Sequence, residues 1–221
     1  MDINLFVQTV AIYALPVLFA ITLHEAAHGY VARHFGDMTA YAQGRISLNP
    51  ARHVDLMGTI VVPLLILAAS KFTGGAGLLF GWAKPVPVNY SALRRPRQNM
   101  LWVAAAGPAA NLVMAFGWAA LFKLAELLPG QYFTQPMLLM GKAGMQVNIV
   151  LMLLNLLPIL PLDGGRILAS LLPTRIAWGY AKLEPFGFPI LLVLLFTSAL
   201  GVILAPMVSF SYRVLGTVFQ I

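Results

Sequence analysis

Two histidines and a glutamate lie close together near the N-terminus, at His24, Glu25 and His28. On a helix, His24 and His28 are one turn apart on the same face, so both imidazoles can reach one metal ion. Glu25 lies roughly 100° around the helix from His24, within reach of a water molecule at that metal. Residues of these types at this spacing predict a hydrolytic metal site in which Glu25 is the base that activates water.

The segment before these residues has the character of a membrane span, because residues 3–23 carry no charge. Ionisable groups at membrane depth are costly, so they indicate a functional site by default. The alternative is a pair of histidines with satisfied hydrogen bonds, next to a glutamate that pairs with an arginine. Hydrocarbon offers no inexpensive way to keep three such groups, which favours the metal site.

The composition predicts a membrane protein. Of 221 residues, 60% are hydrophobic and only 10% are charged, and the mean hydropathy is +0.83. No soluble domain of this size can bury so much apolar surface. Cysteine is absent, so His, Asp, Glu or Asn must hold any metal. The net charge of +7 is scattered between apolar segments, which indicates basic cytoplasmic loops and argues against nucleic-acid binding.

Long apolar segments are predicted to cross the membrane as helices at residues 4–34, 99–128, 137–157 and 186–205. Residues 56–70 and 78–82 are shorter and interrupted by Gly and Pro, which predicts a re-entrant hairpin or one short span with a return. Residues 39–55 are predicted to form short extended segments at the cytoplasmic face. We therefore expect an all-α polytopic membrane protein with about five to six transmembrane helices, and with residues 1–221 as one domain. The first segment lacks a basic region and a cleavage site, so we expect it to be retained.

Basic residues predict the orientation of these spans, because they concentrate in cytoplasmic loops. With Arg45, residues 94–97 and Arg175 facing the cytoplasm, both termini are expected outside. For the C-terminus, the alternative is that residues 209–221 fold back along the surface. His24 precedes Arg33 by about 13 Å of helix rise, so the site is expected within the membrane but nearer the cytoplasm.

A third metal ligand is needed, because a catalytic zinc ion takes three protein ligands and keeps one position open. Asp163 is the candidate, since it follows an apolar segment that descends to the same side as His28 and ends at prolines. Its alternatives are a turn before Gly164 or an ion pair with Arg166. Asn155 is a buried amide that can hydrogen-bond a substrate carbonyl or its oxyanion, or instead bind a neighbouring helix.

Three motifs are distributed along the chain: His24-Glu-Ala-Ala-His28, Gly107-Pro108 with Asn111, and Asn155-Leu-Leu-Pro-Ile-Leu-Pro-Leu-Asp163-Gly-Gly-Arg. Together they resemble the site-2 protease family of intramembrane zinc metalloproteases, peptidase family M50, over nearly the whole chain. Residues 49–53 and 81–89 are similar to the compact bacterial branch of that family. Better-known members carry an inserted PDZ domain, and this sequence has none.

The resemblance implies that His24, His28 and Asp163 hold one Zn²⁺ per chain. It also implies that Glu25 activates water and that Asn155 positions the peptide or stabilises its oxyanion. The expected enzyme is an integral protein of the bacterial inner membrane, surrounded by the lipid bilayer. Its expected partners are transmembrane protein substrates, cleaved during regulated intramembrane proteolysis, and nucleic acid is not among them.

Two other functions remain as alternatives. A membrane metal transporter would also place His and Asp inside the membrane, but it would need polar ligands along a path through several spans. An inactive relative that binds membrane partners would lack the base or a ligand, and the sequence has both. His34 and His53 lie off the metal-facing stripe or in a loop, and we expect them to be solvated.

Overall fold

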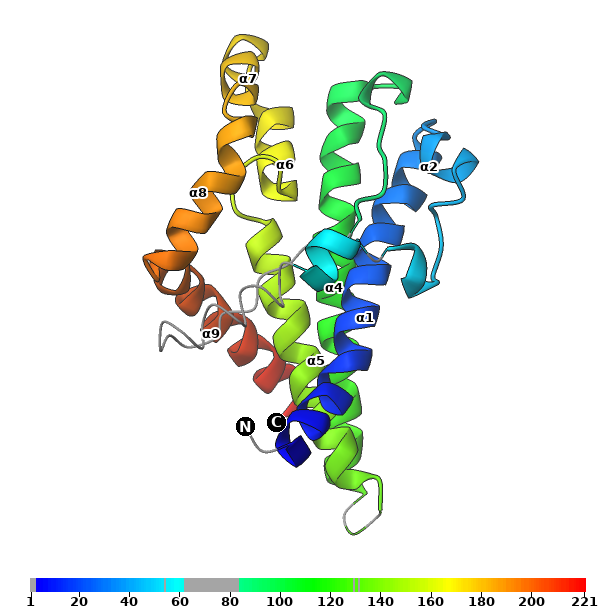
Figure 1. Ribbon diagram of the computed structural model, residues 1–221, viewed down its shortest axis with the longest axis vertical. Coiled ribbons are helices and arrows are strands. Elements are labelled where there is room, and N and C mark those ends of the chain that lie inside the picture. Colours follow the sequence, from blue (N-terminus) through cyan, green and yellow to red (C-terminus); the bar gives the residue numbers. More distant parts are fainter. Residues whose placement is uncertain (1–2, 54, 62–83, 129, 131) are drawn as a thin grey trace.

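The computed structural model describes residues 3–53, 55–61, 84–128, 130 and 132–221. Within these ranges the regular structure is helical and no β-strand occurs (Figure 1), which confirms the predicted all-α class. The elements in chain order are α1 (Ile3–His34), α2 (Thr39–Ala42), η1 (Pro50–Arg52), η2 (Leu56–Val61), η3 (Tyr90–Ala92), α4 (Pro96–Leu127), α5 (Thr134–Asn155), α6 (Asp163–Leu171), α7 (Thr174–Ala181), α8 (Glu184–Phe196) and α9 (Ala199–Phe219).

Four of the described helices, α1, α4, α5 and α9, are long and apolar enough to cross a membrane. The helices α7 and α8 meet at a bend of 62° and would together form a fifth, broken span. A polytopic membrane protein is thereby confirmed, with four or five candidate spans against the expected five to six. The predicted hairpin at residues 56–82 lies mostly outside the described residues, apart from the turn η2.

The first three predicted spans correspond to α1, α4 and α5. The beginning of α4 at Pro96 follows from local chemistry, because proline is well suited to the first turn of a helix, where its missing N–H costs nothing. Helix α5 ends at Asn155, three residues before Pro158, which cannot donate a backbone hydrogen bond.

The last predicted span, at residues 186–205, is wrong in its limits. The chain breaks inside it between α8 and α9, where Ser198 adopts a left-handed conformation with φ of 60°. The Thr197 hydroxyl donates to the Val193 carbonyl at 2.7 Å. Such a side-chain hydrogen bond competes with the backbone hydrogen bonds that would continue α8. Helix α9 then continues to Phe219, so the alternative in which residues 209–221 fold back along the surface is also wrong.

The expectation of extended segments at residues 39–55 also needs correction, because the described part of this region contains the short helix α2 and the turn η1. A side chain accepts a hydrogen bond from a backbone N–H at the start of each element. Asp37 accepts a hydrogen bond from the Thr39 N–H at 2.9 Å, and Asn49 accepts one from the Ala51 N–H at 3.0 Å. Such local bonds favour turns over strands.

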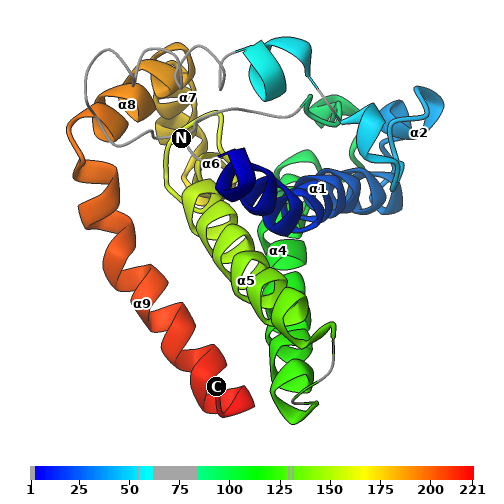
Figure 2. The same cartoon turned by 60° about the horizontal axis from the view of Figure 1, so that its bottom comes forward.

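Helices α1, α4 and α5 pack against one another and form the centre of the molecule. Figure 2 shows α9 on the opposite side of α5 from α1. Small residues allow α4 and α5 to approach closely, since a Cβ atom at Gly144 would lie 2.2 Å from the Trp118 ring. The buried apolar side chains between α4, α5 and the C-terminal helices include Ala115, Ala119, Met145 and Ile149.

Candidate active site

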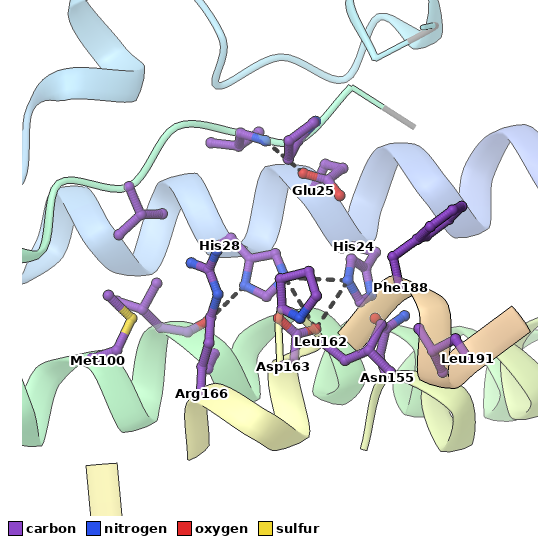
Figure 3. Close-up of a pocket in the computed structure, with 16 residues that line it drawn as sticks. His24, Glu25, His28, Met100, Asn155, Leu162, Asp163, Arg166, Phe188 and Leu191 are labelled. Carbon is purple, nitrogen blue, oxygen red and sulfur yellow. Dashed lines mark hydrogen bonds and ion pairs between the residues drawn. The ribbon is translucent and has the colours of Figure 1, made fainter. Parts of the chain in front are cut away.

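The two histidines of α1 face α4 and are almost completely buried. His24 is 6% exposed and His28 is 9% exposed. Their Nε2 atoms are 3.1 Å apart, as the one-turn spacing predicts. In Figure 3 both rings lie on the same side of α1.

Contacts with α4 determine which ring nitrogen of each histidine faces the site. The His28 Nδ1 atom lies 2.7 Å from the Val103 carbonyl oxygen, which can only accept a hydrogen bond. The His24 Nδ1 atom lies 2.6 Å from the Asn111 side-chain oxygen. A neutral imidazole that donates through Nδ1 keeps a lone pair on Nε2, so both Nε2 atoms are available as metal ligands.

A chain of buried amides fixes the orientation of the Asn111 side chain. Its nitrogen donates to the Ala20 carbonyl at 3.2 Å and to the Asn148 side-chain oxygen at 3.0 Å. The Asn148 nitrogen in turn donates to the Gly144 carbonyl at 2.8 Å. Because these backbone carbonyls can only accept, the Asn111 oxygen must face His24 and accept its Nδ1 proton.

Asp163, the first residue of α6, completes the group. Its Oδ2 atom lies 3.2 Å from His24 Nε2 and 3.4 Å from His28 Nε2. The same oxygen is buried and makes no hydrogen bond. The ion-pair partners of Asp163 within the described residues are therefore these histidines, whereas the alternative at the sequence level was Arg166.

The three converging atoms fit a metal ion. With both histidines neutral, three electron-pair donors face one another with no proton between them, which is unfavourable without a cation. A tetrahedral zinc ion with bonds of about 2.0–2.1 Å separates its ligand atoms by about 3.3–3.4 Å. The observed separations of 3.1, 3.2 and 3.4 Å are close to this value. Across the part of the chain that the structure describes, this is the one group of three or more His and carboxylate side chains that could hold a metal.

The start of α6 depends on two glycines that follow Asp163. A Cβ atom at Gly164 would lie 2.2 Å from the Leu156 carbonyl oxygen, and one at Gly165 would lie 2.6 Å from the backbone of Ile159. Glycine therefore allows the first turn of α6 to rest directly on the chain that leaves α5. At its other end, α6 is capped by Arg97 of α4, which donates to the carbonyls of Ser170, Leu171 and Leu172.

Glu25 leaves α1 on a different side from the histidines (Figure 3). Its Oε2 atom accepts a hydrogen bond from the Val86 N–H at 2.7 Å. Glu25 nevertheless lines the same cavity as His24, His28 and Asp163, so the structure brings the predicted base and the predicted ligands to one site.

Asn155 also lines this cavity, at the C-terminal end of α5. One of its side-chain N–H groups donates to the Leu151 carbonyl at 3.0 Å, which leaves a second N–H and the carbonyl oxygen for another partner. Within the described residues, no hydrogen bond from Asn155 to another helix is present. The cavity has a volume of about 500 Å³ and is otherwise mostly apolar, with Met100, Val103, Phe188 and Leu191 among its walls.

Of the two remaining histidines, His34 is exposed to solvent and His53 is buried. His34 is exposed at the end of α1, as predicted. The prediction for His53 was wrong, because it is only 1% exposed and its Nε2 atom lies 2.8 Å from the Ser47 carbonyl oxygen. The Ser47 carbonyl thus satisfies one ring nitrogen of this buried histidine, whereas its Nδ1 atom has no hydrogen-bond partner among the described residues.

Sequence reasoning did not find three groups that hold the site: the Asn111 side chain, the Val103 carbonyl and the Val86 N–H. Asn111 appeared only as part of a motif, without a role. Its position as an amide within an apolar helix was a usable signal, because a buried amide requires a partner. The backbone groups of Val103 and Val86 carry no signal in their residue types.

A polytopic helical protein with two histidines and a carboxylate converging in a buried cavity, beside a glutamate, belongs to the class of membrane metallohydrolases. Comparison with known proteins agrees. The family model of peptidase family M50 matches residues 123–198. "Putative zinc metalloprotease YwhC" of Bacillus subtilis is 38% identical over 203 residues, which cover 88% of this chain and 84% of that protein.

Two further relatives carry the same description under the name Rip2. The protein from Mycolicibacterium smegmatis is 32% identical over 83% of this chain, and that from Mycobacterium tuberculosis strain H37Rv is 29% identical over the same share. The matches cover 66% of either relative's length. No solved structure matches the chain significantly.

The chain therefore belongs to peptidase family M50. The similarity confirms the predicted family and the predicted class of enzyme, a zinc-dependent metallopeptidase of the membrane.

Proposed function

We propose that this protein is an intramembrane zinc endopeptidase that cleaves peptide bonds within or near transmembrane segments of other membrane proteins. The observation that carries the proposal is the position of the donor atoms. His24 and His28 lie on a candidate span, and their Nε2 atoms converge with the carboxylate of Asp163 beside an apolar cavity. An apolar cavity bordered by a hydrolytic site suits the peptide chain of a membrane segment.

In this proposal His24, His28 and Asp163 hold one zinc ion per chain. When bound, the zinc ion supplies Lewis acidity, which polarises the scissile carbonyl and makes water a stronger acid. Glu25 accepts a proton from the attacking water and passes it to the departing amide nitrogen. The free N–H of Asn155 donates to the scissile carbonyl or to the oxyanion that forms from it.

The substrate must arrive partly unwound. A peptide bond inside a helix has its carbonyl occupied by a hydrogen bond, and the surrounding side chains shield it. We therefore expect helix-breaking residues near the cleavage site to accelerate cleavage. Such selectivity is what regulated proteolysis of membrane proteins requires, because most transmembrane helices must survive.

The decisive experiment compares the wild-type protein with Glu25→Gln on a model transmembrane substrate in liposomes. Glu25→Gln keeps the size of the side chain and all three proposed ligands, so we expect about one zinc per chain and no detectable cleavage. Asn155→Ala should also keep its zinc and lose activity on the order of 10²-fold. Cleavage by Glu25→Gln at nearly the wild-type rate would refute the mechanism.

Zinc content provides the second measurement. The double variant His24→Ala, His28→Ala should lose the metal, and full zinc occupancy in it would overturn the ligand assignment. The same liposomes test the transporter alternative, which predicts zinc flux that Glu25→Gln leaves intact. Apart from the three-ligand group, the ion pair within the described spans joins Lys123 and Glu126 at 3.2 Å. The described spans therefore contain no path of ligands across the membrane.

A further inference from the structure

The segment of residues 84–88, here called the strap, passes beside α1 on the side of Glu25 (Figure 3). It has no regular secondary structure, yet its backbone reaches a side chain that lies 61 positions away in sequence. The Val86 N–H donates to Glu25 Oε2 at 2.7 Å. Within the described residues, this is the hydrogen bond that the Glu25 carboxylate receives, and its other oxygen has none.

Several contacts hold the strap in place independently of Glu25. The Lys84 N–H donates to the His53 carbonyl at 2.9 Å. Arg45 donates to the carbonyl of Lys84 at 2.9 Å and to that of Pro85 at 3.2 Å. Beyond the strap, the Asn89 N–H donates to the fully buried carboxylate of Asp37 at 2.6 Å. The Val86 N–H is therefore positioned by anchors on both sides.

The sequence of the strap leaves one donor at its centre. Pro85 and Pro87 have no N–H, so Val86 carries the only backbone donor between Lys84 and Val88. Gly29 of α1 lets the strap approach, because a Cβ atom there would lie 3.3 Å from the Val86 side chain and 2.9 Å from that of Ile46. The carboxylate thus meets a single fixed donor at close range.

We propose that the Val86 N–H is a positioning group for the catalytic Glu25, a role that rests on the function proposed above. A glutamate side chain has three rotatable bonds, and fixing it costs conformational entropy at each turnover unless the fold has already done so. The bond to Val86 engages Oε2 and leaves Oε1 to accept the proton. Because Val86 also lines the cavity, its side chain contacts the substrate while its N–H acts through Glu25.

Two substitutions at position 86 separate these contributions. Val86→Pro removes the N–H, whereas the matched control Val86→Ala shortens the side chain and keeps the N–H. We expect Val86→Ala to raise KM with little change in kcat. Val86→Pro should lower kcat by on the order of 10- to 10²-fold relative to Val86→Ala, with wild-type zinc content and thermal stability. Equal kcat values for the two variants, beside an active wild type, would overturn the proposal.

A second pair of variants applies if Val86→Pro does not fold. Arg45→Met removes the donor to the Lys84 and Pro85 carbonyls and leaves the Val86 N–H intact, whereas Arg45→Lys keeps a donor at this position. The expected order of kcat is wild type, then Arg45→Lys, then Arg45→Met, with zinc content unchanged. Wild-type kcat in Arg45→Met would overturn the proposal. These results differ from those expected if the proposed function itself is wrong. In that case the wild type would cleave no substrate, or Glu25→Gln would cleave it at the wild-type rate.

Discussion

At the scale of single residues, buried amides outside the proposed ligand set orient the candidate metal ligands. Asn111 accepts the Nδ1 proton of His24, and Asn148 holds Asn111 in the orientation that makes this possible. A metal-ligating histidine needs such a partner, which fixes the tautomer and the plane of the ring. The Val103 carbonyl serves His28 in the same way. Helix α4 therefore supports the proposed metal site without supplying one of its proposed ligands.

The variant Asn111→Leu tests this dependence. It removes the acceptor for His24 at nearly constant volume, so zinc affinity should fall by about 10- to 100-fold, as measured by competition with a chelator. The matched control is Gln146→Leu, which removes a helix contact of a different kind, the hydrogen bond from the Tyr13 hydroxyl of α1 to Gln146 of α5 at 3.0 Å. The control should bind zinc like the wild type. Equal affinities in the two variants would show that Asn111 does not support the metal site.

At the scale of helices, the distance between α1 and α4 is set by a glycine. A Cβ atom at Gly107 would lie 2.4 Å from His28 Nε2 and 2.6 Å from His24 Nε2, the atoms proposed to bind zinc. No side chain fits between the helix and the rings. The close approach also brings the Val103 carbonyl and the Asn111 amide, one turn to either side of Gly107, within reach of the two histidines.

The variant Gly107→Ala should therefore separate α1 from α4 or occupy the place of the metal. We expect loss of stoichiometric zinc and of cleavage, although alanine favours the helix by about 1 kcal/mol over glycine. Gly117→Ala on the same helix is the control, because a Cβ atom there meets nothing within 4 Å. It should keep its zinc and unfold at an equal or higher temperature. Full zinc occupancy in Gly107→Ala would contradict the packing argument.

The elements also show how far the sequence alone could predict this protein. Apolar length identified α1, α4 and α5. The position of Asp163, after an apolar segment that descends to the side of His28 and ends at prolines, pointed to the third ligand. The break in the helix at Ser198 was not predicted, because hydropathy is averaged over a window of residues. Such an average does not detect a single hydroxyl, here that of Thr197, that donates back to the helix. The contact between Glu25 and Val86 joins residues 61 positions apart through a backbone group, so only the folded chain reveals it.

At the scale of the whole molecule, both termini and a group of arginines lie toward different ends. Figure 1 shows both termini in its lower half, whereas α2, α6 and α7 lie in its upper part. The upper elements and their flanking turns carry Arg45, Arg166 and Arg175. Basic residues concentrate in cytoplasmic loops, so this arrangement supports the prediction that both termini face outward. The candidate metal site, where α6 begins, would then lie nearer the cytoplasm.

Labelling of single cysteines tests this orientation in a chain that has no cysteine of its own. Gln98→Cys reports on the basic end of α4, and Tyr132→Cys reports on the turn between α4 and α5, where the side chain is 88% exposed. A membrane-impermeant maleimide added to intact spheroplasts should label position 132 and leave position 98 unlabelled until the cells are lysed. Position 220, just after α9, should behave like position 132, because both the C-terminus and the turn between α4 and α5 lie in the lower half of Figure 1. Labelling of position 98 in intact spheroplasts would reverse the orientation and place the metal site nearer the outer face.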